Sequence, residues 1–288
     1  MTKAAFIGLG VMGFPMAGHL ATAGCDTTVF NRTATKAELW AQRHGNNHAP
    51  TPREACSGKE FAFICVGNDD DLRSVVYGDD GALAGLAEGS ILVDHTTASA
   101  EAAREIATEA AKRGIAFIDA PVSGGEAGAV NGILTIMCGG EETAFQRAEP
   151  VMQAYGQRLM LMGATGAGQL TKMVNQICIG GLLQALAEAV NFARCAGLDS
   201  DKVFDVLSKG ASQSWQMENR TKTMSEGQFD FGFAVDWMRK DFAICLAEAE
   251  KNGAPLPITA LVDQFYRQIQ MKGGSRFDTS SLILNLQE

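Results

Sequence analysis

The sequence lacks several features that would assign it to other classes of protein. It has no uninterrupted apolar run of about 18 residues, the length that a membrane-spanning helix needs. Lysine and arginine number 24 against 33 aspartate and glutamate residues, and the net charge of −9 argues against broad binding to nucleic-acid phosphates. The N-terminus shows no export signal. We therefore expect a cytoplasmic protein that binds neither a membrane nor nucleic acid.

Cysteine and histidine are too scattered to suggest a metal site or a disulfide framework. The seven cysteines include no C-x-x-C pair, and their odd number suits reduced thiols, most of them small core residues. His44 and His48 have helical i, i+4 spacing, but Gly45, Asn46 and Asn47 lie between them. A solvated loop is therefore favoured there over metal ligation, and no metal is expected.

The first part of the chain has the pattern of an α/β domain. Short apolar runs alternate with helical patterns, which indicates βαβ crossovers and a mostly parallel sheet. The runs are rich in Val, Ile and Phe, as in strands that helices cover on both faces. The expected strands are Lys3–Gly8, Asp26–Phe30, Phe61–Val66, Ser90–Asp94, Ala116–Asp119 and Leu134–Cys138, and the first helices are Phe14–Ala23 and Thr33–His44.

The pattern changes after Met162, where a glycine-rich break precedes a long apolar stretch without proline. This stretch, about 166–196, predicts a helix of ~40 Å, and only helical patterns follow it. Gly180 and Gly181 would weaken the long helix unless a neighbour packs closely there. The 288 residues suit two domains. The predicted fold is a Rossmann-type sheet domain at 1–162 and an all-α domain at 163–288, joined by the long interdomain helix.

A glycine motif directly follows the first expected strand and opens the first expected helix. Gly8-Leu9-Gly10-Val11-Met12-Gly13 reads G-x-G-x-x-G. Gly8 permits a tight turn, Gly10 lets the backbone approach a pyrophosphate, and Gly13 lets helix and strand pack closely. In this strand–turn–helix context, a dinucleotide-binding site is favoured over a plain glycine-rich turn.

The end of the second strand indicates which dinucleotide binds. NAD sites usually carry an Asp or Glu there that bonds the ribose 2′-OH, but this sequence has Asn31-Arg32-Thr33. A guanidinium attracts a 2′-phosphate and can bond two of its oxygens, and Asn31 and Thr33 can add hydrogen bonds. NADP is therefore favoured over NAD. The alternative is that Asn31 and Thr33 merely cap the next helix while Arg32 is solvated.

Four motifs run in order along nearly the whole chain: Phe6–Ala17, Asp119–Gly125, Gly168–Asn175 and Lys240-Asp241. They resemble the N-terminal signature, the substrate-binding segment, the catalytic segment and the late K-D pair of the β-hydroxyacid dehydrogenases. That family includes 3-hydroxyisobutyrate dehydrogenase, tartronate semialdehyde reductase and the glyoxylate/succinic semialdehyde reductases. The resemblance implies the same two-domain fold, a small carboxylate substrate and a homodimer or homotetramer.

The resemblance makes Lys172 and Asn175 catalytic, and the chemistry of these residue types agrees. Gly168, Lys172 and Asn175 are spaced to share one helix face. Hydride transfer between an alcohol and a carbonyl needs a proton at the oxygen, and partial desolvation can lower a lysine pKa toward neutrality. Asn175 could hold the substrate or the lysine, and Gly168 would leave room for a ligand. The alternative, a surface lysine, is disfavoured by apolar neighbours such as Met173 and Val174.

The resemblance also assigns the remaining ligand contacts of the first domain. Ser123-Gly124-Gly125 would bind the substrate carboxylate through a hydroxyl and exposed backbone N–H groups, although a plain turn is the alternative. Thr97 would touch the cofactor, and Val66 and Gly67 would line it through their backbone, at strand ends where open sheets bind ligands. The neighbouring His95 is expected to be a loop histidine without a role.

The second domain contributes Lys240, which by resemblance reaches the cofactor while Asp241 steadies it. Trp215 could wall a small substrate pocket or could be a core aromatic. The sequence as a whole predicts an NADPH-dependent reductase, reversibly a dehydrogenase, that interconverts a small β-hydroxy acid and its semialdehyde, with Lys172 as general acid/base. Imine reductases share the architecture but typically lack the lysine, and a non-catalytic NADP sensor would require neither Lys172 nor Asn175.

Overall fold

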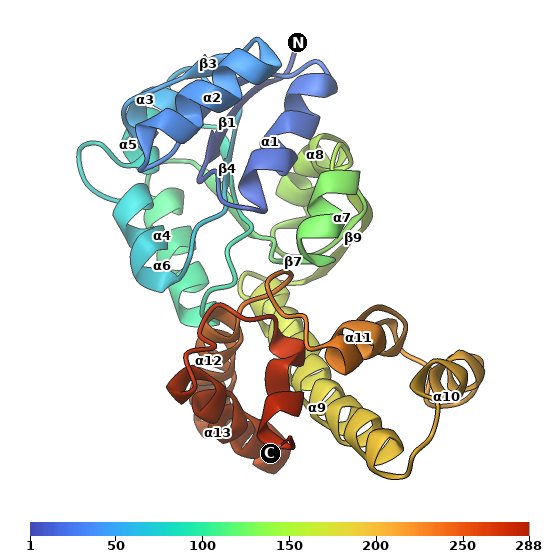
Figure 1. Cartoon of the computed structure of the whole chain (residues 1–288). Coiled ribbons are helices and arrows are strands. Elements are labelled where there is room, and N and C mark those ends of the chain that lie inside the picture. Colours follow the sequence, from blue (N-terminus) through green and yellow to red (C-terminus); the bar gives the residue numbers. More distant parts are fainter. Residues whose placement is uncertain (288) are drawn as a thin grey trace. The chain divides into compact units, whose positions relative to one another are not determined.

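A computed structural model describes residues 1–287 and divides the chain into two compact units, Met1–Lys172 and Met173–Glu288. The expected domain boundary, between residues 162 and 163, lies at the end of strand β9 (Gly156–Gly163), whereas the compact units divide within helix α9 (Ala167–Cys195). The chain therefore passes from one unit to the other inside a continuous helix (Figure 1).

The first unit contains a nine-stranded, mostly parallel sheet, as predicted. Its parallel part has the order β3-β2-β1-β4-β5-β6. Successive strands are added on one side of β1 up to β3 and on its other side from β4 onward. Open α/β sheets bind ligands at the point between β1 and β4 where this order switches. Strand β8 (Leu134–Gly140) is antiparallel to β6 and to β7 (Val122–Ser123), and β9 pairs parallel with β8. The parallel strands are β1 (Lys3–Ile7), β2 (Asp26–Phe30), β3 (Asn47–His48), β4 (Phe61–Ile64), β5 (Ile91–Asp94) and β6 (Ala116–Asp119).

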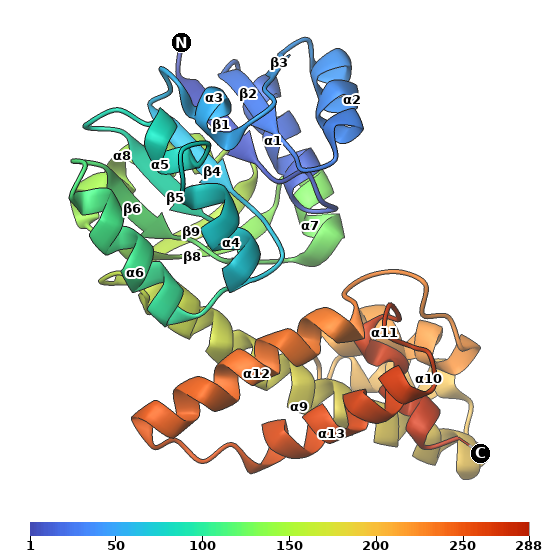
Figure 2. The ribbon, with the colours of Figure 1, turned by 90° about the vertical axis from the view of Figure 1, so that its left-hand side faces the viewer.

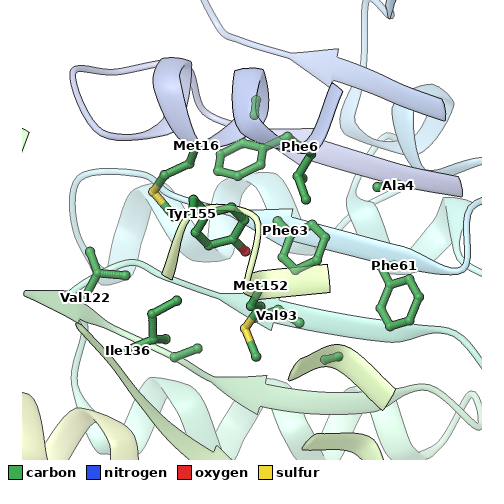
Figure 3. Close-up of a cluster of buried hydrophobic side chains, with 14 of the residues drawn as sticks. Ala4, Phe6, Met16, Phe61, Phe63, Val93, Val122, Ile136, Met152 and Tyr155 are labelled. Atoms are coloured by element: carbon green, nitrogen blue, oxygen red, sulfur yellow. The ribbon is translucent and has the colours of Figure 1, made fainter. Parts of the chain in front are cut away.

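Successive residues of each strand alternate between two helix-covered faces, which is why the runs read as continuously apolar. Phe6 and Phe63 face a core with helices α1 (Gly13–Thr22), α2 (Ala34–His44) and α8 (Glu142–Met152). Figure 3 shows these two rings close to Tyr155 and Met16. The alternate residues face a second core with α3 (Pro52–Cys56), α4 (Asp69–Val76), α5 (Ala82–Gly85) and α6 (Ala100–Ala111).

Two sequence interpretations need correction. His44 ends α2 with its ring 4.9 Å from that of Trp40, and His48 lies in β3, so neither is part of a solvated loop. Strands of two residues carry too little pattern to be predicted. The seven cysteines are free thiols, but Cys178 and Cys195 are exposed rather than core residues.

The second unit is all helical within residues 173–287, as predicted. Its core joins the apolar face of α9 to the later helices, which Figure 2 shows beside one another. By length and composition alone α9 could cross a bilayer, but Leu183, Leu186 and Ala187 belong to this core, as in a helix of a folded domain. The later elements are α10 (Ser200–Leu207), α11 (Trp215–Glu226), α12 (Val235–Asn252), α13 (Pro257–Met271) and the 3-10 helix η1 (Thr279–Asn285).

The expected close neighbour of the α9 glycines is a ring of the second unit's core. A Cβ at Gly180 would overlap the ring of Phe242, which is fully buried in the core of this unit. A Cβ at the adjacent Gly181 would make only an ordinary contact of 3.6 Å with Ile258. The helix therefore needs glycine at the first position and only tolerates it at the second.

This difference predicts opposite effects for two matched substitutions. Gly180→Ala should destabilise the protein, because overpacking a core typically costs about 1–3 kcal/mol. Gly181→Ala should be neutral or stabilising by up to about 1 kcal/mol, since alanine is the better helix former. Urea unfolding of both variants measures the two free energies, and equal effects would show that the Phe242 contact does not constrain α9.

Candidate functional site

The glycine motif forms the turn after β1, where the strand order reverses. Gly8 has φ +94°, and a side chain there would also overlap the carbonyl oxygen of Cys65. Gly10 has no neighbour within 4 Å of its Cβ position, so the space that a pyrophosphate would need is open. Helix α1 begins at Gly13 without a side-chain cap, and the positive end of its dipole lies at this turn, where an anion is favoured. The turn thus has the geometry that a dinucleotide requires.

Asn31 braces this turn from the end of β2. Its Oδ1 accepts a hydrogen bond from the Leu9 N–H at 2.9 Å, and its Nδ2 donates to the carbonyl oxygen of Thr33 at 3.0 Å. Thr33 directly precedes α2, but its side chain makes no capping hydrogen bond. The alternative in which Asn31 and Thr33 serve as side-chain caps of α2 is therefore wrong.

Arg32 extends from the surface, with 88% of its side chain exposed, and meets a carboxylate that the sequence did not indicate. Its Nη1 donates to Asp71 Oδ1 at 3.2 Å. Asp71 lies in the first turn of α4, 39 residues along the chain and within a run of three aspartates, so no local pattern singles it out. An ion pair this exposed adds little stability, and an anionic ligand could replace it.

One hydrogen bond joins the loops after β4 and β5, and a second one orders the loop after β5. Thr96 Oγ1 accepts from the Val66 N–H at 3.1 Å, and the Thr96 N–H donates to Asp94 Oδ1 at 2.9 Å. The other two cofactor contacts expected in these loops are Gly67, which follows Val66, and Thr97, which follows Thr96. Asp94 Oδ2 is buried without a hydrogen-bond partner, and burial raises the pKa of Asp94 to about 7.

His95 lies in the loop after β5, as expected, but it is buried and has two hydrogen-bond partners. It is 1% exposed and its ring is stacked 5.9 Å from that of Phe63. Its Nδ1 lies 2.7 Å from the carbonyl oxygen of Ala120 and its Nε2 lies 2.8 Å from the hydroxyl of Tyr155. A carbonyl only accepts, so Nδ1 carries the proton and Nε2 accepts from Tyr155. Burial lowers the pKa of His95 to about 4, so the ring is neutral.

The expected substrate loop follows the short strand β7. Ser123 is half-buried, whereas Gly124 and Gly125 are exposed. The two glycines have φ +131° and +60°, a succession that other residues rarely adopt. Helix α7 (Gly125–Asn131) begins there without a side-chain cap, so backbone N–H groups of the loop are available to an anion.

Lys172 is buried, with 7% exposure, and lies near the start of α9. Asp119, at the end of β6, fixes that start by accepting hydrogen bonds from the N–H groups of Gly166 at 2.7 Å and Gln169 at 2.9 Å. The surface-lysine alternative is therefore wrong. Gly168 also needs correction: a Cβ there would lie 2.6 Å from the Asp119 carbonyl oxygen, so this glycine allows the helix to pack on the sheet and does not make room for a ligand.

In the second unit, a chain of side chains links Asn175 to Lys240. Asn175 Nδ2 donates to Gln176 Oε1 at 2.8 Å, and Gln176 Nε2 donates to Asp241 Oδ2 at 2.6 Å. The Lys240 ammonium lies 2.9 Å from Asp241 Oδ1, so Asp241 does steady this lysine. Gln176 was missed because an uncharged side chain next to a motif residue gives no signal of its own. The contact of Lys240 with a cofactor stays a prediction.

Trp215, at the start of α11, is 52% exposed, so the core-aromatic alternative is wrong. The Arg220 guanidinium lies 4.9 Å from the Trp215 ring and 5.0 Å from that of Phe231. This contact orients the tryptophan, and its place in a substrate pocket stays a prediction. Within residues 1–287, no group of three His, Cys, Asp or Glu side chains could hold a metal ion.

Comparison with known proteins agrees with this geometry. Residues 3–163 match the NAD binding domain of 6-phosphogluconate dehydrogenase. Residues 166–286 match the domain described as NAD-binding of NADP-dependent 3-hydroxyisobutyrate dehydrogenase. Together the matches define an NAD(P)-dependent oxidoreductase that acts on hydroxyacids. The chain belongs to the β-hydroxyacid dehydrogenase family, as the four motifs predicted.

Individual relatives match along the whole chain. An oxidoreductase of Shewanella frigidimarina is 60% identical, with 100% of this chain and 99% of the relative covered. The 2-hydroxy-3-oxopropionate reductase of Escherichia coli is 33% identical, with 99% and 97% covered. The solved structure of Mycobacterium tuberculosis 3-hydroxyisobutyrate dehydrogenase with L-serine is 29% identical, with a TM-score of 0.90 and 100% of both chains covered.

The two buried neighbours Asp94 and His95 predict opposing effects of pH on stability. The raised pKa of Asp94, from 3.8 to about 7, stabilises the fold below pH 3.8 and this contribution is lost as pH rises to 7. The lowered pKa of His95, from 6.5 to about 4, stabilises the fold above pH 6.5 and this contribution is lost as pH falls to 4. In the wild type the two slopes largely cancel between pH 4 and 7.

Single substitutions should expose each slope, by up to about 1.4 kcal/mol per unit of pKa shift. Asp94→Asn should become steadily less stable, relative to the wild type, as pH falls from 7 to 4. His95→Gln should become less stable, relative to the wild type, as pH rises over the same range. Urea unfolding at several pH values measures this, and identical slopes in the three proteins would contradict it.

Proposed function

We propose that this enzyme uses NADPH to reduce a small semialdehyde acid to the corresponding β-hydroxy acid, in a reversible reaction with Lys172 as general acid/base. The observation that carries the proposal is Lys172 itself: it matches the family's catalytic segment and is buried on a helix anchored to the sheet edge that bears the cofactor loops. The imine reductase and sensor alternatives would not require a lysine at this position.

The chemistry needs one proton donor at the carbonyl oxygen. When bound, the nicotinamide cofactor would supply the hydride for the carbonyl carbon. As the carbon–oxygen π bond breaks, the Lys172 ammonium gives a proton to the oxygen, and the alcohol forms without a free alkoxide. In the reverse direction, neutral Lys172 takes the proton from the hydroxyl. Asn175, three residues further along α9, would hold the substrate or the lysine without adding charge.

The substrate class follows from the anion-binding loop and from the relatives. Ser123-Gly124-Gly125 offers a hydroxyl and backbone N–H groups suited to a carboxylate. The M. tuberculosis relative was solved with L-serine, which is itself a three-carbon β-hydroxy acid. The E. coli relative acts on 2-hydroxy-3-oxopropionate, a three-carbon semialdehyde. These support a substrate of three or four carbons, with Trp215 as one wall of its pocket.

The preference for NADP rests on Arg32. Its guanidinium is exposed at the end of β2, where the adenosine ribose of a dinucleotide lies in this fold. A 2′-phosphate would take the place of the Asp71 carboxylate on Arg32 and gain charge-assisted hydrogen bonds. NADH would leave the Arg32–Asp71 pair intact and gain nothing from it.

The first experiment compares the wild type with Lys172→Ala on glyoxylate, succinic semialdehyde, methylmalonate semialdehyde and tartronate semialdehyde, and follows NADPH absorbance. We expect turnover of at least one aldehyde acid and its loss by about 10²–10⁴-fold in the variant, the usual contribution of a positioned acid. NADPH binding, followed by fluorescence, should persist and serves as the folding control. A variant that kept full turnover would exclude Lys172 as the proton donor.

The second experiment tests the cofactor preference with Arg32→Ala. Loss of a charge-assisted contact worth about 1.5–3 kcal/mol should lower kcat/KM for NADPH by roughly 10- to 100-fold and leave that for NADH nearly unchanged. Arg73→Ala is the matched control, because Arg73 lies on α4 but pairs with Glu105. Equal losses with both cofactors, or a wild type that prefers NADH, would refute the role of Arg32.

A further inference from the structure

Gln169 occupies a fully buried position between the first turn of α9 and the loop after β5. Its Oε1 accepts from the Ala98 N–H at 3.1 Å, and its Nε2 donates to the Thr96 carbonyl oxygen at 2.7 Å. The amide thus bonds the backbone on both sides of Thr97. Because the amide oxygen and the amide nitrogen bond the same three-residue segment, 96–98, the side chain fixes that segment in position and orientation.

The backbone of Gln169 is itself fixed. Its N–H donates to Asp119 Oδ2 at 2.9 Å, while Asp119 Oδ1 accepts from Gly166 at 2.7 Å. Gln169 and Asp119 are both fully buried. The first turn of α9 is therefore attached to the end of β6 through Asp119 and to the loop after β5 through Gln169.

Thr96 extends these contacts to the loop after β4. Its hydroxyl accepts from the Val66 N–H, and its own N–H donates to Asp94. The two loops expected to line the cofactor are thus connected to each other and, through Gln169, to α9. Lys172 lies three residues beyond Gln169, on the adjoining turn of the same helix.

We propose that Gln169 is a positioning residue that sets the Thr97 loop and Lys172 in register, so that the proton donor and the cofactor loop act in one fixed geometry. The proposal rests on the role proposed above for Lys172. Both backbone partners need a side chain of this length that accepts at one atom and donates at the other, because an apolar side chain would leave the Ala98 N–H and the Thr96 carbonyl unpaired. A misplacement of about 1 Å far from the chemistry can cost two orders of magnitude in rate.

The isosteric variant Gln169→Glu distinguishes positioning from a purely structural role. When neutral, the glutamic acid can accept from Ala98 and donate its O–H to the Thr96 carbonyl, as the amide does. When ionised, it turns an acceptor toward that carbonyl and the contact is lost. Burial should raise the pKa of the new carboxyl above about 4.3, so that the change falls in a pH range accessible to the enzyme.

The test measures kcat and KM from pH 5 to pH 9 for the wild type, Gln169→Glu and Gln169→Asn, with NADPH and the best aldehyde acid of the panel. We expect kcat of Gln169→Glu to approach the wild-type value near pH 5 and to fall roughly 10- to 100-fold below it near pH 9. Gln169→Asn, one carbon too short to span the gap, should show lowered kcat at every pH. Gln157→Glu, the same change at an exposed position of β9, should follow the wild-type profile.

Each rate is divided by the fraction of folded, NADPH-binding protein at the same pH. A Gln169→Glu enzyme whose corrected kcat follows the wild type throughout would overturn the proposal and leave Gln169 with a structural role only. If Gln169→Glu does not fold at high pH, the corrected kcat of Gln169→Asn decides, and a wild-type value overturns the proposal. Activity retained by Lys172→Ala would instead identify failure of the proposed function.

Discussion

The buried carboxylate of Asp119 makes the interactions on which the geometry around Lys172 depends. A carboxylate removed from water is costly unless it is hydrogen-bonded. Burial raises the pKa of Asp119, while the N–H groups of Gly166 and Gln169 oppose this by stabilising the charged form. Those same N–H groups belong to the first turn of α9, whose dipole favours a negative charge. The charge and the helix therefore stabilise each other, and Lys172 takes its position from that contact.

Asp94 and Asp119 show how one residue type can serve two purposes at neighbouring strand ends. They are paired directly across β5 and β6. Asp119 uses both oxygens on α9, whereas Asp94 uses one oxygen on Thr96 and leaves the other buried without a partner. Burial raises the pKa of Asp94 to about 7, and the neighbouring charge of Asp119 adds to the rise. Gln169 connects the two arrangements. Its amide bonds the backbone of Thr96 and Ala98, next to Asp94, and its own backbone lies in α9, which Asp119 anchors.

The sequence predicted what depends on local pattern and missed what depends on contacts between distant segments. Strands β2 and β6 begin and end where the apolar runs indicated, and the turn after β1 lies at the glycine motif. The burial of His95 was missed because its partners, Ala120 and Tyr155, come from other elements. Gly168 was read as room for a ligand, although the sheet edge that crowds it is nearly 50 residues away in sequence. Gln169 and Asp71 carried no local signal for the same reason.

The Arg32–Asp71 pair limits how far the motif after β2 can define cofactor choice. A guanidinium alone would give that corner of the site a positive charge, but the ion pair makes it nearly neutral. A 2′-phosphate placed there would feel the attraction of Arg32 and the repulsion of Asp71, and solvent would screen both because Arg32 is almost fully exposed. Any preference for NADP over NAD here would therefore depend on the difference between two opposing interactions, the attraction of Arg32 after β2 and the repulsion of Asp71 in α4. A carboxylate that the fold places next to Arg32 from a distant helix affects the charge at this position as much as a carboxylate at the end of β2 would.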